Sequence, residues 1–417
     1  MSDIIIKPSR LNGVVKAPPS KSDVHRAVIC AALSGGVCEI APVSLSNDIK
    51  ATIDCVRALG AKCALDGDTL RVDGSNIFSK KSAKLNCIES GSTLRFFVPI
   101  AAAGGINADF TGSGSLLSRP IGIFSDLLPK AGVSCETSGT LPLKISGQLK
   151  AGKFEVAGNI SSQFITGLLF ALPMLDGDSE IVLTTKLESV GYIDMTIACL
   201  KKFGIKIERT DYGWFVKGNQ KYTPTDYRTD GDWSQAAFFM TAGALSGDVK
   251  VEGVTLNSTQ CDKEIAELLK RFGADIEATE NSVKVRKSKL RGIEIDARNI
   301  PDLVPILSVA ATAAEGVTRI YGAERLRIKE SDRLKTTADM LKSLGGNVVE
   351  KSDGLVITGS APLKGGKVNG ANDHRIVMSA SVAALICGGE VTITDRESIN
   401  KSFPDYFEKY KDIGGVC

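Results

Sequence analysis

Two kinds of helix alternate along the chain, and each has its own hydrophobic pattern. The first kind is amphipathic and ends at a glycine, as in CVRALG before residue 61 and LLKRFG before residue 274. Segments of alternating apolar and polar residues follow it, for example AKCALDGDTLRV. Because strands alternate with period two and helices with a period near 3.6, each such stretch predicts a helix followed by a β-hairpin.

The second kind of helix is apolar on all sides, which predicts that it is buried. AVICAALSGG and AAFFMTAGALSG are examples, and short strands such as VCEIAPV and VKVEGV follow them. Together the two patterns predict a unit of about 70 residues with the order helix, strand, helix, hairpin.

The glycines that end these helices recur at a nearly constant interval, which indicates an internal repeat. The amphipathic helices end 69 or 72 residues apart, at Gly60, Gly132, Gly204, Gly273, Gly345 and Gly414. The apolar helices end 69 to 73 residues apart, at Gly36, Gly105, Gly177, Gly247, Gly316 and Gly389. Glycine suits the left-handed conformation that follows a helix, so we expect that conformation at all of these positions. The chain therefore contains six copies of one unit.

The six units predict two domains of three units each. The sixth unit stops before its hairpin, whereas IIIKPSRLNGVVKA at the N-terminus is a hairpin without a helix. We therefore expect the N-terminal strands to complete the last unit. Division at 19–20 and 228–229 gives one domain of 209 residues, 20–228, and one of 208 residues, 1–19 with 229–417. Two such connections predict a hinge and a cleft that closes on a ligand.

Composition narrows the function classes. Hydrophobic residues at 43% and charged residues at 24% are typical of a globular protein, and the 42 glycines are explained by the repeat. A net charge of +3 favours neither nucleic acid nor a membrane surface as partner. The N-terminus lacks the apolar region of a signal peptide, and the ten cysteines include no CxxC, so we expect a cytoplasmic protein with reduced thiols. Two histidines, His25 and His374, argue against a His-rich metal site.

Unusual polar residues gather directly before the helices, in motifs such as PSKSDVHR, ESGSTLR, TQCDKEI, RIKESDR and NDHR. The start of a helix has unpaired N–H groups and partial positive charge, so it favours phosphate or carboxylate groups. Helix capping is the simpler interpretation of any single motif. Cations, however, recur at equivalent positions, namely Lys21, Arg26, Arg119, Lys329, Arg333, Arg375 and Lys401. The whole set predicts a cationic cleft for a small polyanionic substrate.

Two carboxylates occur among these cations, Asp302 and Glu330. Capping and salt bridging would explain them, but in a site so rich in cations they are also natural proton acceptors and donors. Lys21 can act as an acid as well as a charge. The chain has no GxSxG, Cys–His arrangement or GxxxxGK[ST] loop, which argues against a covalent hydrolase or a P-loop kinase.

Nine motifs in order, from residue 19 to 407, resemble the 5-enolpyruvylshikimate-3-phosphate synthases, a family of enolpyruvyl transferases. The motifs are PSKSDVHR, ESGST with Arg95 after it, SRPIG, SSQF, ESVGYID, PDLVP, RIKESDRL, NDHRIVM and KSFPDYF. The resemblance implies an α/β fold of two similar domains, each built from three βαβαββ repeats in an inside-out α/β barrel.

The resemblance also implies an activity. The family transfers the enolpyruvyl group of phosphoenolpyruvate to the 5-hydroxyl of shikimate 3-phosphate and releases phosphate, a step of the shikimate pathway toward chorismate and the aromatic amino acids. No metal or organic cofactor is implied, no nucleic acid or membrane partner is expected, and the chain is expected to be a monomer. Glu330 would protonate C3 of phosphoenolpyruvate, Asp302 would accept the 5-hydroxyl proton, and Lys21 would assist the departure of phosphate.

The implied binding residues fall into two sets. Shikimate 3-phosphate would contact Lys21, Ser22, Arg26, Ser161, Ser162, Gln163, Ser189, Tyr192, Asp302, Arg325 and Lys329. Phosphoenolpyruvate would contact Lys21, Gly91, Arg119, Gln163, Arg333, Arg375 and Lys401.

The sequence departs from the family pattern at two positions. Arg325 stands where several relatives have Asn, and Phe96 follows Arg95 where many have Pro. Gly91 keeps the small residue expected of an enzyme sensitive to glyphosate.

The sequence is less consistent with three other functions. The related UDP-N-acetylglucosamine enolpyruvyl transferases usually carry a reactive cysteine before their Arg-Pro, whereas the stretch here is TGSGSLLSRP. RNA 3′-phosphate cyclases use related units, but about four of them, and aromatic residues are only 6% of this chain. A binding scaffold without activity would not need all the cationic and acid/base positions.

Overall fold

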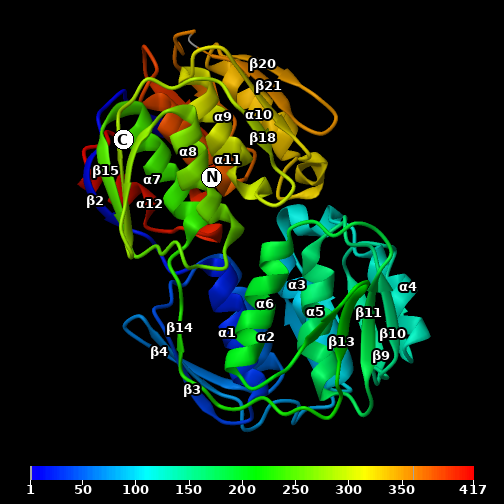
Figure 1. Cartoon of the computed structure of the whole chain (residues 1–417). Helices are drawn as coiled ribbons and strands as arrows, with labels where there is room; N and C mark the ends of the chain where they lie inside the picture. Colours follow the sequence, from blue (N-terminus) through cyan, green and yellow to red (C-terminus); the bar gives the residue numbers. More distant parts are fainter. Residues whose placement is uncertain (1, 360) are drawn as a thin grey trace. The chain divides into compact units, whose positions relative to one another are not determined.

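The computed structural model describes residues 2–359 and 361–417, which form two compact units. Pro19–Thr229 form one unit, called here the central unit. Asp230–Cys417 and the residues up to Pro18 form the other, called the terminal unit. The chain passes between them at 18–19 and 229–230, one residue from each boundary expected from the sequence. Figure 1 shows the elements of both units.

The central unit contains three sheets of four strands, one for each repeat. The first repeat has α1 (Lys21–Leu33), β3 (Val37–Ala41), α2 (Asn47–Ala58), β4 (Lys62–Asp66) and β5 (Thr69–Asp73), and it borrows β14 (Tyr227–Arg228) as its fourth strand. The second has β6 (Ser82–Asn86), α3 (Gly91–Ala103), β7 (Asn107–Thr111), η1 (Gly114–Ser118), α4 (Gly122–Lys130), β8 (Val133–Glu136) and β9 (Leu143–Gly147). The third has β10 (Lys153–Val156), α5 (Ser162–Ala171), η2 (Leu172–Met174), β11 (Ser179–Leu183), α6 (Val190–Lys202), β12 (Glu208–Thr210) and β13 (Gly213–Val216).

The terminal unit repeats this order. The fourth repeat has β2 (Asn12–Lys16), α7 (Trp233–Ser246), β15 (Asp248–Glu252), η3 (Cys261–Lys263), α8 (Glu264–Phe272), β16 (Asp275–Ala278) and β17 (Ser282–Arg286). The fifth has β18 (Glu294–Asp296), η4 (Pro301–Leu303), α9 (Val304–Ala313), β19 (Val317–Tyr321), η5 (Glu324–Ile328), α10 (Arg333–Ser343), β20 (Asn347–Glu350) and β21 (Leu355–Thr358). The sixth has β22 (Gly366–Val368), α11 (His374–Ala384), β23 (Val391–Ile393), η6 (Arg396–Lys401), α12 (Tyr406–Asp412) and β1 (Ile4–Ile6).

Each complete repeat has the same sheet topology. In the second repeat β6 runs parallel to β7, β7 runs antiparallel to β9, and β8 pairs with β9 at the edge. A helix covers the crossover between the two parallel strands, as such connections require. The predicted fold class, two α/β domains of three βαβαββ repeats, is confirmed.

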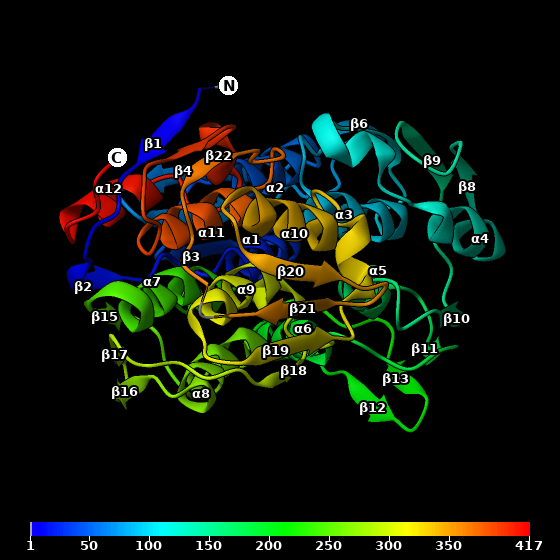
Figure 2. The same ribbon diagram turned by 90° about the horizontal axis from the view of Figure 1, so that it is seen from above.

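Most helices of each unit lie in its middle, and the sheets lie on its outside, as Figures 1 and 2 show. The apolar helices are the innermost elements, as their all-round hydrophobicity predicts. All residues of α7 and of α11 are buried. Each unit has one hydrophobic core of its own. Among the described residues, every helix is too short or too polar to span a bilayer.

The N-terminal strands do not form the expected hairpin. β1 pairs antiparallel with β23 of the sixth repeat, whereas β2 pairs parallel with β15 of the fourth. The backbone N–H of Lys7 donates to the carbonyl of Val416 at 2.9 Å, so the two ends of the chain do meet. The expectation that both strands complete the last repeat is therefore wrong for β2. Five residues separate the two strands, and Pro8 among them cannot donate to a ladder, which is unfavourable for a tight two-residue hairpin.

The repeating glycines serve two purposes. Nine of the twelve have positive φ, as expected, namely Gly60, Gly105, Gly132, Gly177, Gly204, Gly273, Gly316, Gly345 and Gly414. The expectation is wrong for Gly36, Gly247 and Gly389, and the φ of Gly247 is −155°. A Cβ there would lie 1.7 Å from the carbonyl oxygen of Leu11, so glycine at this position permits close approach of the N-terminal segment.

Candidate active site

In the central unit, Arg26 connects the starts of two helices that carry predicted shikimate 3-phosphate ligands. From α1 its Nε donates to Thr196 Oγ1 at 2.9 Å and its Nη2 donates to the carbonyl of Tyr192 at 2.8 Å, both in α6. Lys21, the first residue of α1, forms an ion pair with Asp48 at 2.7 Å. Ser189, which caps α6, has a φ of +55°, unusual for a residue other than glycine. Lys21, Arg26, Ser189 and Tyr192 thus belong to one pair of helix starts.

A second pair of helix starts, those of α3 and α5, brings the predicted phosphoenolpyruvate ligands together. Arg95 Nη1 donates to Gln163 Oε1 at 2.8 Å, and Gln163 Nε2 donates to Ser92 Oγ at 2.8 Å. A Cβ on Gly91 would lie 2.6 Å from Arg119 Nη1 and 2.7 Å from Arg95 Nη1. Two buried guanidinium groups therefore pack directly against the backbone of Gly91, and a side chain at this position would require both of them to shift.

The predicted serines begin α5. Ser161 is the N-cap of this helix, and its hydroxyl accepts from the N–H of Gln163 at 3.3 Å. Ser162 is buried as the first helical residue. Hydroxyl groups at a helix start suit a phosphate, because the free N–H groups of the first turn lie beside them.

A chain of neutral hydrogen bonds lies below these helix starts. His25 Nδ1 and Thr52 Oγ1 are 2.7 Å apart, Thr52 and Thr93 hydroxyls are 2.8 Å apart, and Thr93 donates to Ser90 Oγ at 2.8 Å. All four side chains are buried. Burial, together with the charges of Lys21 and Arg26, lowers the pKa of His25 well below its usual value of 6.5, so the imidazole is neutral. This chain joins α1, α2 and α3 without a buried charge.

In the terminal unit, Arg333 forms ion pairs with three carboxylates. Its Nη1 donates to Asp302 Oδ1 at 2.8 Å, its Nη2 lies 2.6 Å from Glu330 Oε2, and its Nε donates to Asp373 Oδ2 at 2.8 Å. The Arg333 side chain is 2% exposed, so these ion pairs are screened very little by water. The two predicted acid/base residues therefore share one guanidinium group.

Asp302 has two further cations beside it. Arg375 Nη2 lies 3.2 Å from its Oδ2, and Lys329 Nζ lies 3.9 Å from its Oδ1. Burial alone would raise the pKa of Asp302, but Arg375, Lys329 and Arg333 together lower it well below the usual range. Burial lowers the pKa of Lys329 to about 8, although Asp302 and Glu330 act in the opposite direction. Asp302 is therefore fully ionised in the absence of substrate.

The remaining predicted residues of this unit surround the cluster. Lys401 is 5% exposed, and its Nζ donates to the carbonyl of Asn372, just before Asp373, at 2.6 Å. Arg325 is buried and donates to the carbonyl of Arg298 at 2.7 Å. Within each unit the predicted residues thus occur together at the starts of helices.

Sequence reasoning assigned no role to three residues that the structure places in these networks. Asp373 is a direct partner of Arg333 and caps α11, Asp48 is the partner of Lys21, and Arg95 holds Gln163. The sequence did contain an indication of their importance, because all three stand in the same kind of helix-start motif as the predicted site residues.

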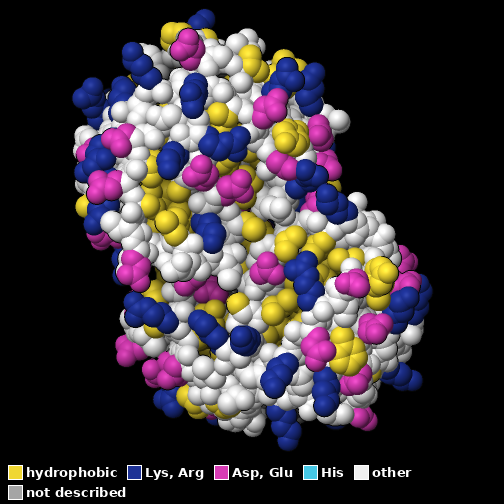
Figure 3. Space-filling view, in the orientation of Figure 1, with side chains coloured by type: hydrophobic (Ala, Val, Ile, Leu, Met, Phe, Trp, Pro, Cys, Tyr) yellow, Lys and Arg dark blue, Asp and Glu magenta, His cyan; other side chains and the backbone are white. Residues whose placement is uncertain are grey.

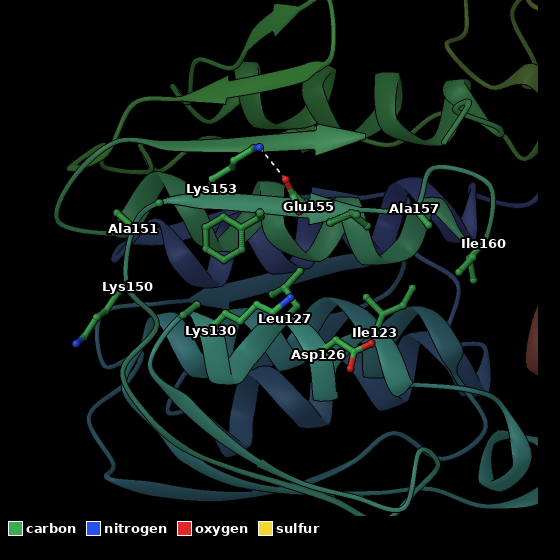
Figure 4. A pocket seen from close by; sticks show the side chains of 14 residues that line it. Ile123, Asp126, Leu127, Lys130, Lys150, Ala151, Lys153, Glu155, Ala157 and Ile160 are labelled. Carbon is green, nitrogen blue, oxygen red and sulfur yellow. Dashed lines mark hydrogen bonds and ion pairs between the residues drawn. The ribbon is translucent and has the colours of Figure 1, made fainter. Parts of the chain in front are cut away.

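A hollow in the central unit is a separate feature. It measures about 690 Å³ and lies between α4 and β10, lined by apolar residues such as Leu127 and Phe154. Figure 4 shows Lys130, Lys150 and Lys153 around it. None of the predicted site residues lines it, so its size does not make it the active site.

On one face of the molecule, positive and negative surface charges are mixed (Figure 3). On the face drawn in Figure 3, Lys and Arg side chains are interspersed with Asp and Glu side chains in both units. Within the described ranges, no group of three or more His, Cys, Asp or Glu side chains could hold a metal ion. The buried ion-pair cluster of the terminal unit and the helix starts of the central unit remain the chemically distinctive features.

The fold is that of the enolpyruvyl transferases. A solved structure of the enolpyruvyl transferase NikO from Streptomyces tendae aligns with a TM-score of 0.81 at 20% identity, covering 99% of this chain and 97% of that one. A solved structure of EPSP synthase from Acinetobacter baumannii aligns with a TM-score of 0.84 at 28% identity, covering 99% of this chain and 98% of that one.

Sequence comparison narrows the class to one family. The family model for EPSP synthase (3-phosphoshikimate 1-carboxyvinyltransferase) matches residues 5–410. Proteins named 3-phosphoshikimate 1-carboxyvinyltransferase are 48% identical in Clostridium acetobutylicum and 46% identical in Clostridium novyi, each covering 100% of this chain and 98% of the relative. The chain belongs to the EPSP synthase family. The family and enzyme class predicted from the motifs are confirmed, and the UDP-N-acetylglucosamine alternative is not favoured.

Proposed function

We propose that this chain transfers the enolpyruvyl group of phosphoenolpyruvate to the 5-hydroxyl of shikimate 3-phosphate and releases phosphate. The observation that carries the proposal is the Arg333 cluster, in which Asp302 and Glu330 share one buried cation. The cluster occurs in a chain that matches the EPSP synthase family over residues 5–410. Two carboxylates held this way suit a reaction that needs one proton donated and one removed.

The central unit supplies the anion-binding part of the proposed site. Ser161, Ser162 and Ser189 would bind the phosphate of shikimate 3-phosphate, with Lys21, Ser22, Arg26 and Tyr192 beside the same substrate. Gly91, Arg119 and Gln163 would bind phosphoenolpyruvate, with Arg333, Arg375 and Lys401 of the terminal unit acting on the same molecule. Arg325 and Lys329 would contact shikimate 3-phosphate. The hinge and closure expected from the two crossings stay predictions.

The terminal unit supplies the acid and the base. Glu330 would donate a proton to C3 of phosphoenolpyruvate, which leaves C2 cationic. The 5-hydroxyl oxygen would then bond to C2 while Asp302 takes its proton. Glu330, ionised by the first step, would take a proton back from C3 as the bond from C2 to the phosphate oxygen breaks, which restores the vinyl group, and Lys21 would assist the departing phosphate.

Substrate charge makes this chemistry possible. The two substrates together bring about six negative charges, since each phosphate carries nearly two and each carboxylate carries one. Their anionic groups compete for Arg333, Arg375 and Lys329, so the carboxyl groups of Asp302 and Glu330 gain proton affinity when substrate binds.

Phosphate release tests the proposed activity directly. The purified chain should release phosphate from phosphoenolpyruvate when shikimate 3-phosphate is added and not when UDP-N-acetylglucosamine is added. Activity with only the second acceptor would overturn the proposal.

Solvent exchange tests the role of Glu330. In deuterated water, Glu330→Gln should incorporate deuterium at C3 far more slowly than the parent chain. Glu350→Gln is a matched control, because Glu350 pairs with Arg327 at 2.7 Å outside the Arg333 cluster. Exchange at the parent rate in Glu330→Gln would assign the proton to another group.

Three finer expectations stay predictions. A monomer should elute at the mass of one chain, 44.1 kDa. A cytoplasmic location fits ten cysteines without a disulfide. Glyphosate should inhibit, given the small residue at Gly91.

A further inference from the structure

Asp262 is a buried carboxyl group to which the proposed chemistry assigns no role. It lies in η3, directly before α8, in the motif TQCDKEI. The residue is 3% exposed, and its Oδ2 accepts a hydrogen bond from Ser234 at the start of α7. Its Oδ1 is also buried and receives no hydrogen bond in the described part of the chain. An ionised carboxylate in such a place is costly, so the position calls for a functional reason.

The charged groups that act on Asp262 come from three other elements. They are Asp302 in η4, Arg375 in α11 and Asp232, the N-cap of α7. Its neighbour Lys263 does not pair with it, because Lys263 Nζ donates to the carbonyls of Leu256 and Ser258. Burial, and then the negative charge of Asp302, raise the pKa of Asp262 to about 7. Asp262 is therefore a second carboxyl group within the electrostatic reach of the proposed base.

The proton affinity of Asp302, the proposed base, is low, and a second carboxylate nearby would raise it. Three cations lie within 4 Å of Asp302, and they make its carboxylate a weak proton acceptor. A negative charge on Asp262 acts in the opposite direction, because two neighbouring carboxylates raise each other's affinity for a proton. Arg375 is attracted to both carboxylates, so ionised Asp262 also weakens its hold on Asp302.

We propose that Asp262 is a positioning residue of the enolpyruvyl transfer, whose buried carboxylate supports proton acceptance by Asp302 and shares the charge of Arg375. The inference rests on the proposed function, since it gives Asp302 the role of base. Asp262 itself touches no substrate in this scheme, and the 5-hydroxyl proton goes to Asp302.

The proposal predicts a particular pH dependence. Asp262 ionises near neutral pH, so its support is absent in acid and present in mild alkali. In Asp262→Asn the Ser234 contact can be kept but the charge is lost. We expect kcat/KM at pH 8 to fall about 3- to 10-fold, with little change at pH 5.5 and with KM within about twofold of the parent. The substrate phosphates titrate near pH 6 in every variant, so the comparison between variants isolates Asp262.

Ser234→Ala provides a second variant with an opposite signature. It keeps the carboxyl group but removes the hydroxyl that stabilises its ionised form, so the rise in kcat/KM should move to higher pH and still reach a high plateau. Asp275→Asn is the matched control, because Asp275 is exposed and pairs with Arg286 at 3.3 Å on β17. Its profile should match the parent profile.

The outcomes separate the inference from the proposed function. A parent-like profile in Asp262→Asn, or a loss that is equal at all pH values, would overturn the role of Asp262. If Asp262→Asn fails to fold, an unshifted profile in Ser234→Ala would overturn it instead. Asp302→Asn should abolish turnover in either case, and full activity there would reject the proposed base rather than the inference alone.

Discussion

The central and terminal units have the same topology but hold their polar site residues in opposite ways. In the central unit, neutral groups from His25 to Ser90 form the buried chain beneath the helix starts. In the terminal unit, Arg333 lies among three carboxylates. The same repeat therefore fixes where helix starts lie, and the side chains decide the chemistry found there.

The difference suits two tasks. Cations and hydroxyl groups predominate among the predicted site residues of the central unit, where Lys21 pairs with the single carboxylate of Asp48, and such groups bind phosphate and carboxylate anions. Carboxylates paired with a buried cation have proton affinities that change when an anionic substrate competes for that cation. We infer that the central unit serves mainly binding and the terminal unit mainly proton transfer.

The largest expected effect concerns the charged network. Arg333→Met would leave Asp302, Glu330 and Asp373 without their common cation, and removal of one partner of a buried ion pair costs about 3–5 kcal/mol. Urea unfolding should show this loss in the terminal unit. Lys335→Met in the same helix removes an exposed pair with Asp339 and should cost less than about 0.5 kcal/mol. Equal losses of unfolding free energy in the two variants would show that the buried Arg333 network is no more important for stability than the exposed Lys335–Asp339 pair.

The second effect concerns binding in the central unit. Gly91→Ala places a methyl group 2.6 Å from Arg119 Nη1, so both arginines must move. We expect KM for phosphoenolpyruvate to rise about tenfold or more, with kcat less affected, since about 1.4 kcal/mol of binding corresponds to tenfold. Gly122→Ala at the start of α4 has no atom within 4 Å of the new methyl group and should leave KM unchanged. A larger loss in kcat than in KM would assign this region to the chemical step.

A third effect is a pH dependence of stability in the central unit. The folded pKa of His25 lies below 6.5, so as pH falls the unfolded chain binds the proton first and the folded state loses stability below pH 6.5. Between pH 6.5 and 5.5 the parent should lose up to about 1 kcal/mol more than His25→Gln. Denaturant midpoints at both pH values measure the difference. Parallel slopes would show that His25 is not buried in its neutral form.

The smallest effect tests the end of the neutral chain. Ser90 caps α3, and its oxygen accepts from the N–H of Thr93 at 3.2 Å and also from the Thr93 hydroxyl. Ser90→Ala should cost about 1 kcal/mol for the lost cap, plus the effect on Thr93. Ser46→Ala removes a cap that accepts only the N–H of Ile49, so it should cost less. A smaller loss for Ser90→Ala than for Ser46→Ala would argue against a connected chain.

Much of this architecture could be predicted from the sequence, because the same pattern of helices and strands occurs in each of the six units. Glycine spacing and alternating helix types indicated the six units, helix-start motifs indicated the cations and carboxylates of the proposed site, and the family resemblance implied its other residues. The pairing of β2 with β15 could not be predicted, since it depends on contacts between residues more than 230 apart in sequence. The role proposed for Asp262 could not be predicted either, because its motif resembles an ordinary helix start. Only its burial and its electrostatic interaction with Asp302 distinguish it.

The placement of β1 and β2 has a consequence for the order in which the chain can fold as it is synthesised. The partners of these strands, β23 and β15, leave the ribosome only after the whole central unit has been made. The central unit is continuous and includes its own β14, so it can complete its sheets first. β1 and β2 lack these partners until then, and Ile4 can pair with Ile393 only after residue 393 has been made. We therefore expect the terminal unit to be the slower to fold and the more exposed to aggregation while the nascent chain lengthens.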